Sequence, residues 1–469
     1  MRKPLIILGL AIILAILAAG FSIPIAAGSS FSGDAGDSGA ADLAASALNL
    51  TADSIEIIFT KSAQTLGNTR TFDIAIGDID LDGDNDVFMA NYIGSSQLWL
   101  NDGNAVFSLS PQTFSVSEVH GVSMRDFNSD AYPDIFLISQ AGPSKVYFNN
   151  MNGTFTAGGQ NIGSGADEPI KIVPGDVDSD GDLDVVISYY MLPVKVWSND
   201  GNGFFTVSSS QCSEANAPYM ELVDINGDTY VDLFLAIMDQ PDEVWTNDGS
   251  GNFVNSGQTL GVAEGYDYTA SGDIDGDGDI DIALSNSVEG VKIWLNQENT
   301  GSFVEAGPYF AAGIQKVALL DADLDEDLEL FTSHNTDGNV LWLNTGSANF
   351  ESLGPIFGNA FMAGIASGKL DDDDDFDVVL GIKENSGGNP VYFNESRHIA
   401  AGTCGDANGD ESINILDVGY LIGYLYKGSP APDPPQIADV DHSGAVNILD
   451  VGYIVAYLYK GGPAPSCPS

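Results

Sequence analysis

The clearest chemistry in this sequence lies in aspartates that alternate with other residues around a glycine turn. Between Asp273 and Asp281, carboxylates stand at positions 1, 3, 5 and 9 of the run, and Gly278 at position 6 supplies the turn. Such a loop brings several carboxylate oxygens to one point, which is unfavourable unless a cation neutralises them. Oxygen-only ligation suits Ca²⁺ better than Zn²⁺, and better than Mg²⁺, which retains more of its water. The run therefore predicts a calcium site in which the ion stabilises a turn and carries out no reaction.

The same loop recurs six more times at nearly constant spacing. The first positions of successive loops are 48, 50, 48, 49, 48 and 48 residues apart. In the seventh loop Lys369 replaces the first carboxylate, and its ammonium could itself neutralise the acidic residues beside it. We therefore expect six calcium sites in this region and leave the occupancy of the seventh loop open. The expected ligands are Asp78, Asp80, Asp82 and Asp86; Asp126, Asn128, Asp130 and Asp134; Asp176, Asp178, Asp180 and Asp184; Asp224, Asn226, Asp228 and Asp232; Asp273, Asp275, Asp277 and Asp281; Asp321, Asp323, Asp325 and Glu329; and Asp371, Asp373 and Asp377.

Three of the six expected calcium loops lack the turn glycine. Ala131, Thr229 and Glu326 stand at position 6 of the second, fourth and sixth loops. Glycine adopts the left-handed backbone conformation of such a turn without strain, whereas a residue with a Cβ does not. We therefore expect strained backbone or weaker calcium binding in these three loops.

The elements that carry the loops repeat with the same period. Each period contains a strand with a Phe, a strand that leads into the Asp loop, a third strand directly after it, and a fourth with an aromatic residue followed two residues later by Asn. Four short strands in about 48 residues are typical of a β-propeller blade. The sequence thus predicts a mainly β fold with a seven-bladed β-propeller at residues 54–394, a linear solenoid being the alternative. The aromatic positions are Trp99, Tyr147, Trp197, Trp245, Trp294, Trp342 and Tyr392.

The two ends of the repeat region complement each other. No Phe-bearing strand follows Asn394, whereas Ile55–Phe59 precedes the first loop without an aromatic strand before it. If Ile55–Phe59 pairs into the last blade, main-chain hydrogen bonds close the ring and leave no open sheet edge. We predict that closure.

These residues resemble a known family. The runs Gly77–Asp86 and Gly175–Asp184, followed by Trp-x-Asn and Asn-Asp-Gly, resemble the FG-GAP/VCBS repeats of integrin-α-like propellers. The resemblance covers about 340 residues in seven in-phase copies. It implies a seven-bladed propeller that holds calcium in a loop between two strands of each blade.

Two nearly identical segments 33 residues apart follow a short expected linker at 395–403. Each has oxygen ligands at positions 1, 3, 5, 9 and 12, which is EF-hand-like spacing with Asp in place of the final Glu. Apolar residues then recur at helical spacing, and Gly428 and Gly461 with a following Pro mark the helix ends. The expected calcium ligands of these two sites are Asp406, Asn408, Asp410, Asn414 and Asp417, and Asp439, Asp441, Ser443, Asn447 and Asp450.

This duplicated loop-helix unit, residues 404–469, resembles a type I dockerin domain. The resemblance implies a small α-helical domain that docks to a cohesin-bearing partner. The family's partner contacts map here to the apolar residues Ile415, Leu416, Ile448 and Leu449, which could instead be core residues of a small domain.

The three cysteines are expected to play structural parts. Cys404 and Cys467 bracket the C-terminal unit, and we expect them to form a disulfide, which export permits. Cys212 is left over, and a small buried residue is favoured over a reactive thiol.

The N-terminal residues predict export. Arg2 and Lys3 precede an apolar run and small residues near Ala27, so residues 1–27 are predicted to be a signal peptide and residues 28–53 a flexible leader. An uncleaved membrane anchor is the alternative, although Gly20 and Pro24 interrupt the run. We expect a secreted protein, held at a cell surface if its dockerin meets a cohesin.

The composition of the chain excludes some classes of binding partner and some classes of enzyme. With 67 acidic and 15 basic residues the formal net charge is −52, which argues against nucleic acid and anionic membranes. The four histidines lack zinc-ligand spacing, and no nucleophile elbow, P-loop or dinucleotide fingerprint is present. Some glutamates stand outside the calcium loops and could form the carboxylate pair of a glycosidase. These are Glu168, Glu214, Glu221, Glu243 and Glu264.

Three functions remain open from the sequence. We favour a secreted, non-catalytic binding or adhesion protein that recognises a glycan or surface protein through its propeller. A dockerin-borne polysaccharide hydrolase or lyase, with its site at the propeller centre, is the alternative. A purely structural surface protein is the third.

Overall fold

The computed structural model describes residues 54–399, 404–460 and Pro465, apart from short gaps. The predicted signal peptide and the whole predicted leader therefore lie outside the described residues. Within the described parts, no helix is long and apolar enough to span a membrane. The gaps are 165, 213–215, 263–266, 287–289, 308–309, 311–313, 335–337, 359–361, 372, 374, 384–387, 409–411, 428, 430, 433–434 and 441–444.

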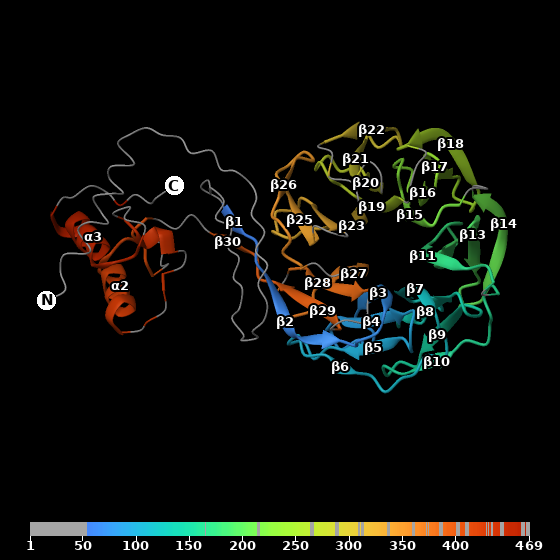
Figure 1. Cartoon of the computed structure of the whole chain (residues 1–469), viewed down its shortest axis with the longest axis horizontal. Coiled ribbons are helices and arrows are strands. Elements are labelled where there is room, and N and C mark those ends of the chain that lie inside the picture. The colour runs from blue at the N-terminus through green and yellow to red at the C-terminus, as the bar shows by residue number, and fades with distance from the viewer. Residues whose placement is uncertain are drawn as a thin grey trace, which may run out of the picture. The chain divides into compact units, whose positions relative to one another are not determined.

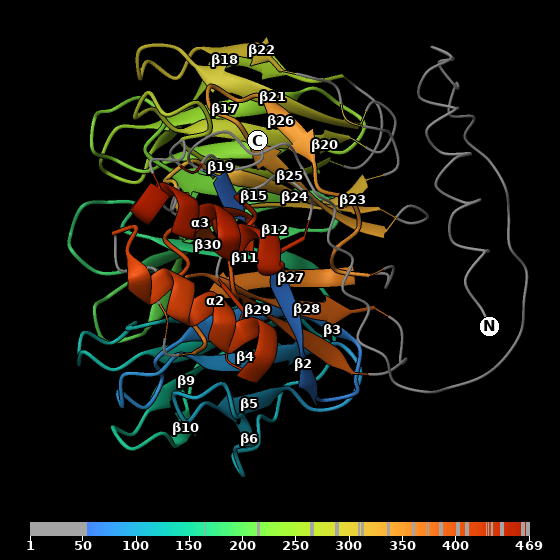
Figure 2. The same cartoon turned by 90° about the vertical axis from the view of Figure 1, so that its left-hand side faces the viewer.

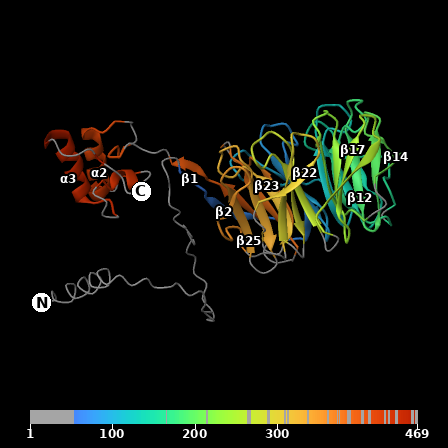
Figure 3. The same cartoon turned by 90° about the horizontal axis from the view of Figure 1, so that it is seen from above.

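Residues 59–394 form seven four-stranded antiparallel blades around a ring (Figure 1). The innermost strands of successive blades contact one another and line the centre. Seen from the side, the strands run between the two faces of the ring (Figure 3). From the innermost strand outward, the blades are β3 (Thr71–Gly77), β4 (Asp86–Asn91), β5 (Gln97–Leu100), β6 (Ser108–Leu109); β7 (Val119–Arg125), β8 (Asp134–Ser139), β9 (Lys145–Asn149), β10 (Phe155–Ala157); β11 (Pro169–Gly175), β12 (Asp184–Tyr189), β13 (Leu192–Asn199), β14 (Phe205–Cys212); β15 (Tyr219–Val223), β16 (Asp232–Ala236), β17 (Asp242–Asn247), β18 (Phe253–Leu260); β19 (Asp267–Gly272), β20 (Asp281–Asn286), β21 (Gly290–Asn296), β22 (Phe303–Ala306); β23 (Ile314–Leu320), β24 (Glu329–His334), β25 (Gly338–Asn344), β26 (Phe350–Ser352); and β27 (Met362–Gly368), β28 (Asp377–Ile382), β29 (Asn389–Asn394), β2 (Phe59–Leu66).

The core lies between the blades. The second strands β4, β8, β12, β20 and β28 are buried at every residue, because each blade packs against a neighbour on both faces. This explains why their sequences are apolar without alternation. Phe88 of β4, for example, packs with Phe114, with ring centroids 4.9 Å apart, and both share a cluster with Ile135 of the next blade. The predicted seven-bladed propeller is confirmed.

Ring closure is confirmed, but by a segment shifted from the predicted one. β2 pairs with β29, and Phe59 lies opposite Asn394, as Phe155 lies opposite Asn149 in the second blade. The Phe-bearing strand is thus the outermost strand of the preceding blade in every repeat. β29 ends at Asn394. Just beyond it the backbone N of Glu395 donates a hydrogen bond to Ile58 O at 2.7 Å, and β1 (Ser54–Glu56) pairs with β30 (Arg397–Ile399) in the segment expected to be a linker.

The C-terminal unit contains two helices, α2 (Ile415–Lys427) and α3 (Ile448–Lys460), and the 3₁₀ turn η1 (Pro435–Ala438). The two helices lie side by side (Figure 2). Val418 and Leu421 of α2 and Val451 and Ile454 of α3 are buried in one small core. Their helical spacing is the one that the sequence predicts.

Candidate metal centres

All seven Asp loops connect the innermost strand of a blade to its second strand. Because every blade has the same strand order, the loops gather at one face of the ring. Five of them bring three carboxylates within 4.8 Å of one another. In loops two and four Asn128 and Asn226 stand at position 3, so the cluster there contains an amide oxygen in place of one carboxylate. The five acidic clusters are Asp78, Asp80 and Asp86; Asp176, Asp178 and Asp184; Asp273, Asp275 and Asp281; Asp321, Asp323 and Asp325; and Asp371, Asp373 and Asp375.

Buried oxygens in these loops fit a bound cation. Six carboxylate oxygens of the Asp loops are buried and have no hydrogen-bond partner among the described residues. Burial and neighbouring carboxylates raise the pKa of Asp323 to about 7, so charging these groups without a counter-ion is unfavourable. Hard oxygen donors at this density suit a divalent ion such as Ca²⁺. The six atoms are Asp80 Oδ1, Asp176 Oδ1, Asp178 Oδ1, Asp323 Oδ1, Glu329 Oε1 and Asp375 Oδ1.

The carboxylate at position 9 also holds the blade together. Asp86 Oδ2 accepts a hydrogen bond from the backbone N of Ile79 at 3.1 Å, and Oδ1 accepts one from the backbone N of Asn101 at 2.8 Å. Asp86 is buried, and this burial raises its pKa to about 7 although both hydrogen bonds lower it. Residues Asp134, Asp184, Asp232, Asp281 and Asp377 make the same two contacts in their blades.

The Asn of the aromatic-x-Asn pattern joins neighbouring blades, a role that the sequence analysis did not assign. In each blade its Nδ2 donates to a backbone carbonyl oxygen at position 2 of the preceding blade's Asp loop, at 2.7–2.9 Å. The available sequence signal for this role was the recurrence of Asn two residues after each of the seven repeated aromatic residues. The seven pairs are Asn101–Leu370, Asn149–Ile79, Asn199–Phe127, Asn247–Val177, Asn296–Ile225, Asn344–Ile274 and Asn394–Ala322.

The second, fourth and sixth loops, which lack a turn glycine, keep the left-handed turn. Ala131, Thr229 and Glu326 have φ of 70°, 78° and 74°, close to the 92° of Gly278. A left-handed residue with a Cβ costs about 1–2 kcal/mol, and a β-branched Thr is the least suited of the three. Leu81 and Leu324 at position 4 also have positive φ. Nothing in the sequence indicated this, because neither position carries a glycine.

The seventh loop uses a residue that the sequence analysis missed. Asp375 at position 7, with Asp371 and Asp373, completes an acidic cluster in the loop whose first position is Lys369. Burial and a hydrogen bond with Asp373 raise the pKa of Asp375 to about 8. A carboxylate at position 7 was the available signal, hidden in a run of five consecutive aspartates.

In the C-terminal unit, the predicted ligands at positions 9 and 12 also cap the helices. Asn414 Oδ1 accepts a hydrogen bond from the backbone N of Leu416, while Asp417 Oδ2 accepts one from the backbone N of Asn414 at 2.7 Å. This reciprocal capping box recurs at Asn447 and Asp450. Among the other predicted ligands Asp406 and Asp439 are buried, whereas Asp410, Asp441 and Ser443 lie outside the described residues.

Family models match both parts of the chain. A model described as FG-GAP-like repeat matches residues 78–136, 126–187, 224–284 and 273–332, and one described as dockerin type I domain matches residues 404–459. The chain carries FG-GAP-like repeats and a type I dockerin domain. The strands of blade seven lie wholly outside the matched ranges, yet they complete the same ring.

Solved structures share the fold at very low sequence identity. A crystal structure of BBS1N in complex with ARL6DN, soaked with mercury, has 8% identity and a TM-score of 0.50, and the match covers 72% of this chain and 96% of that one. A lead-soaked crystal of the same complex has 9% identity and a TM-score of 0.48, covering 71% and 96%. No curated protein matches the chain.

The dockerin domain exposes the four residues to which the family's partner contacts map. The exposed fractions are 51% for Ile415, 61% for Leu416, 50% for Ile448 and 64% for Leu449. These side chains are therefore not core residues, which removes that alternative. Dockerin domains bind Ca²⁺ and cohesins, and the domain indicates an extracellular, cohesin-anchored protein.

The cysteines and the glutamates considered for catalysis are the remaining candidate residues. Cys404 is disulfide-bonded, and its expected partner Cys467 lies outside the described residues. Cys212 is free and buried, and burial raises the pKa of its thiol to about 12, which makes it a poor nucleophile.

Of the glutamates considered for a catalytic pair, Glu243 accepts a hydrogen bond from Trp245 Nε1, and Glu221 lines the centre of the ring. Glu214 and Glu264 lie outside the described residues.

Proposed function

We propose that this protein is a secreted, calcium-dependent recognition protein whose propeller binds a ligand and whose dockerin attaches it to a cohesin-bearing scaffold. The observation that carries the proposal is the exposed apolar set Ile415, Leu416, Ile448 and Leu449 on a matched dockerin domain. Exposed apolar residues gathered in a repeated pattern are typical of a protein interface. Each half of the domain presents the same pair, so the docking face is two-fold repeated.

Exposed glycines beside these residues support close approach of a partner. Gly419 in α2 and Gly452 in α3 are exposed, and a Cβ at either position would meet no atom within 4 Å. A glycine inside an exposed helix costs about 1 kcal/mol relative to alanine, so packing within the domain does not account for it. A partner surface that lies flat against both helices would account for a glycine at each position.

We assign the acidic clusters of the propeller to calcium and to architecture. Their carboxylates accept backbone hydrogen bonds within the loops, as Asp78 does from Asp82 and Gly83. We propose six such calcium sites, two more in the dockerin, and an ion in the seventh loop held by Asp371, Asp373 and Asp375. If each propeller site has an affinity of ~0.1 mM, then ~1 mM calcium stabilises the fold by about 1.4 kcal/mol per site.

The recognition function is tested by screening the whole protein on a glycan array and against polysaccharides, with calcium and with EDTA. Calcium-dependent binding without release of product supports recognition. Cleavage of any polysaccharide would overturn it in favour of a hydrolase or lyase. Cohesin binding is measured separately on immobilised cohesin, so that loss of docking and loss of ligand binding are told apart.

A further inference from the structure

The centre of the ring contains a cavity of about 250 Å³ that none of the calcium loops explains. It is lined by side chains from the innermost strands of several blades. Among them are Asp73 of β3, Lys171 of β11, Tyr219 and Glu221 of β15, Tyr268 of β19 and Lys316 of β23. This size is below the usual range for drug-sized ligands and fits one ring-sized molecule.

Lys316 places its charge over two aromatic rings in this cavity. Its Nζ lies 5.1 Å from the ring centroid of Tyr219 and 5.0 Å from that of Tyr268, and the two ring centroids are 4.2 Å apart. No described carboxylate lies within ion-pair distance of this Nζ. Asp73 acts on Lys316 electrostatically, and its Oδ2 accepts a hydrogen bond from the backbone N of Val122 at 3.1 Å.

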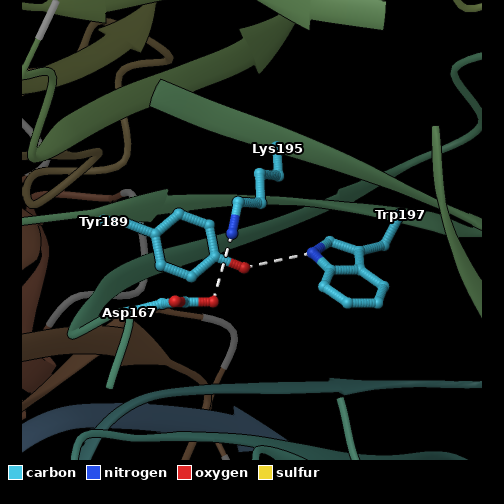
Figure 4. A network of polar contacts seen from close by, with 4 residues as sticks. All are labelled: Asp167, Tyr189, Lys195 and Trp197. Atoms are coloured by element: carbon cyan, nitrogen blue, oxygen red, sulfur yellow. Dashed lines mark hydrogen bonds and ion pairs between the residues drawn. The ribbon is translucent and has the colours of Figure 1, made fainter. Parts of the chain in front are cut away.

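Lys195 shows how this protein neutralises a lysine elsewhere. Its Nζ lies 4.4 Å from the ring centroid of Tyr189 and forms an ion pair with Asp167 at 3.1 Å, while Trp197 Nε1 donates to Tyr189 Oη (Figure 4). The aromatic contact is the same as at Lys316, but here a carboxylate completes it. At Lys316 no carboxylate of the described residues takes that position, and we infer that a ligand does.

Basic residues are scarce in this chain, yet four are grouped here. Lys171 and Lys383 lower the pKa of Lys316, and Arg70 lowers that of Lys383, so each of the four charges lies within electrostatic reach of at least one other. The Arg70 guanidinium lies over the rings of Phe72 and Tyr92, and its buried Nε has no hydrogen-bond partner among the described residues. In a protein of net charge −52, such a group concentrates positive potential at one place.

Acidic and hydroxyl groups in the cavity limit the charge of the ligand. Glu221 forms a hydrogen bond with Ser271, and Lys171 partly offsets its negative charge. Asp73 lies in the same cavity. These carboxylates would repel a dianion such as a phosphate ester, whereas they can accept hydrogen bonds from the hydroxyl groups of a monoanion.

We propose that this cavity binds a hexuronate, with its carboxylate at Lys316 and Lys171 and an apolar face of its ring against Tyr219 and Tyr268. A hexuronate combines one negative charge, several hydroxyl groups and a flat apolar face, which are the three features that the cavity lining matches. This inference rests on the proposed recognition function and names the class of ligand. Glu221 and Ser271 are placed to select among hydroxyl configurations.

The proposal is tested by isothermal titration of the whole calcium-loaded protein with galacturonate and glucuronate, and with galactose and glucose as neutral matches. At least one uronate is expected to bind, with a dissociation constant at least about tenfold lower than that of its neutral match. Lys316→Met is expected to weaken uronate binding about tenfold or more. Lys195→Met, which removes a lysine of similar aromatic contact outside the cavity, is expected to leave binding unchanged.

Further controls detect misfolded variants and distinguish failure of the uronate site from failure of the proposed recognition function. Lys316→Arg keeps the charge and should retain binding, and each variant's thermal midpoint in calcium is compared with that of the parent. Equal affinity for uronates and neutral sugars, or unchanged binding in a folded Lys316→Met protein, would overturn the uronate site. If the glycan array shows calcium-dependent binding of a neutral glycan while the uronates fail, recognition stands and the uronate site falls. If inorganic sulfate binds as tightly as the uronates, the cavity is a general anion site and the proposal is wrong.

Discussion

The side-chain amide of Asn101 donates a hydrogen bond to the backbone carbonyl oxygen of Leu370, 2.9 Å away and 269 residues along the chain. The equivalent bond joins each of the other six blades to the one before it. Blade one is thereby attached to blade seven in the same way as any neighbouring pair. Together with the pairing of β2 and β29, this bond makes the ring continuous.

Replacing one of these asparagines should destabilise the whole propeller. Asn247→Ala removes hydrogen bonds to Val177 O and Val231 O and leaves buried carbonyl groups unpaired. We expect a loss of about 1–3 kcal/mol in the free energy of unfolding, measured by urea denaturation in calcium. Asn104→Ala, at an exposed turn residue, should change it by less than about 0.5 kcal/mol. Equal effects of the two variants would contradict the inter-blade role.

Relieving the left-handed strain should stabilise the fourth loop. Thr229 has φ of 78°, and Thr229→Gly keeps the backbone N that Asp224 accepts from. We expect a gain of about 0.5–1 kcal/mol in the free energy of unfolding, since the relieved strain exceeds the entropy that glycine adds to the unfolded chain. The reverse change, Gly278→Ala, meets no neighbouring atom within 4 Å and should cost about 1–2 kcal/mol through the backbone alone. Calorimetry of both variants in calcium measures these differences.

Position 3 of the third loop offers a graded test of calcium binding. Asp178→Ala should remove one bound calcium ion and about 1.4 kcal/mol of the calcium-dependent stabilisation. Asp178→Asn should keep the ion, because loops two and four carry Asn at that position. Equilibrium dialysis counts the bound ions, and thermal unfolding with calcium and with EDTA gives the stabilisation. If Asp178→Ala binds as many ions as the parent, the third loop is not a calcium site.

The repeated docking face predicts that one damaged half can be tolerated. Leu416→Asp or Leu449→Asp alone should weaken cohesin binding only severalfold, because the other half still presents an intact pair. The double variant should lose more than about 2 kcal/mol of binding free energy, as hot-spot residues do. Surface plasmon resonance on immobilised cohesin measures the three affinities. A single variant as weak as the double would show that both halves engage at once.

Uronate binding should decline as the pH rises through about 8. Burial first, and then Lys171 and Lys383, lower the pKa of Lys316 to about 8, while Asp73 acts in the opposite sense. The protonated lysine binds the carboxylate, so deprotonation above pH 8 removes the attraction. Burial raises the pKa of Glu221 to about 7, and its ionisation adds negative charge in the same direction. Dissociation constants at pH 6.5 and 9.5 should differ for the parent, and less for Lys316→Arg, which stays charged.

The periodic features of this protein could be predicted from sequence, and the non-periodic ones could not. The aspartates of the loops and the aromatic-x-Asn positions recur every 48 to 50 residues, which fixed the number of blades. The bounds of the closing strand were misjudged, since Phe59–Leu66, and not Ile55–Phe59, pairs with β29. Asp375 was missed because a run of aspartates conceals which side chains converge.

The central cavity has a periodic signal in the sequence that the sequence analysis missed. Tyr219, Tyr268 and Lys316 come from three different blades, and each stands five residues before the first position of its Asp loop. They meet only because the innermost strands of the ring converge. Exposure of Leu416 and Leu449 likewise depends on which face of each helix packs against the other.

The pairing of β2 with β29 sets an order of events during synthesis. The strand Phe59–Leu66 is made before any of the blades, but its partner strand Asn389–Asn394 is among the last parts of the propeller to be made. Until β29 is made, β2 has no partner strand and its edge is exposed. Contacts between such distant segments form late and slowly. A chain released before β29 is made would therefore leave the edge of β2 exposed and able to pair with a strand of another chain.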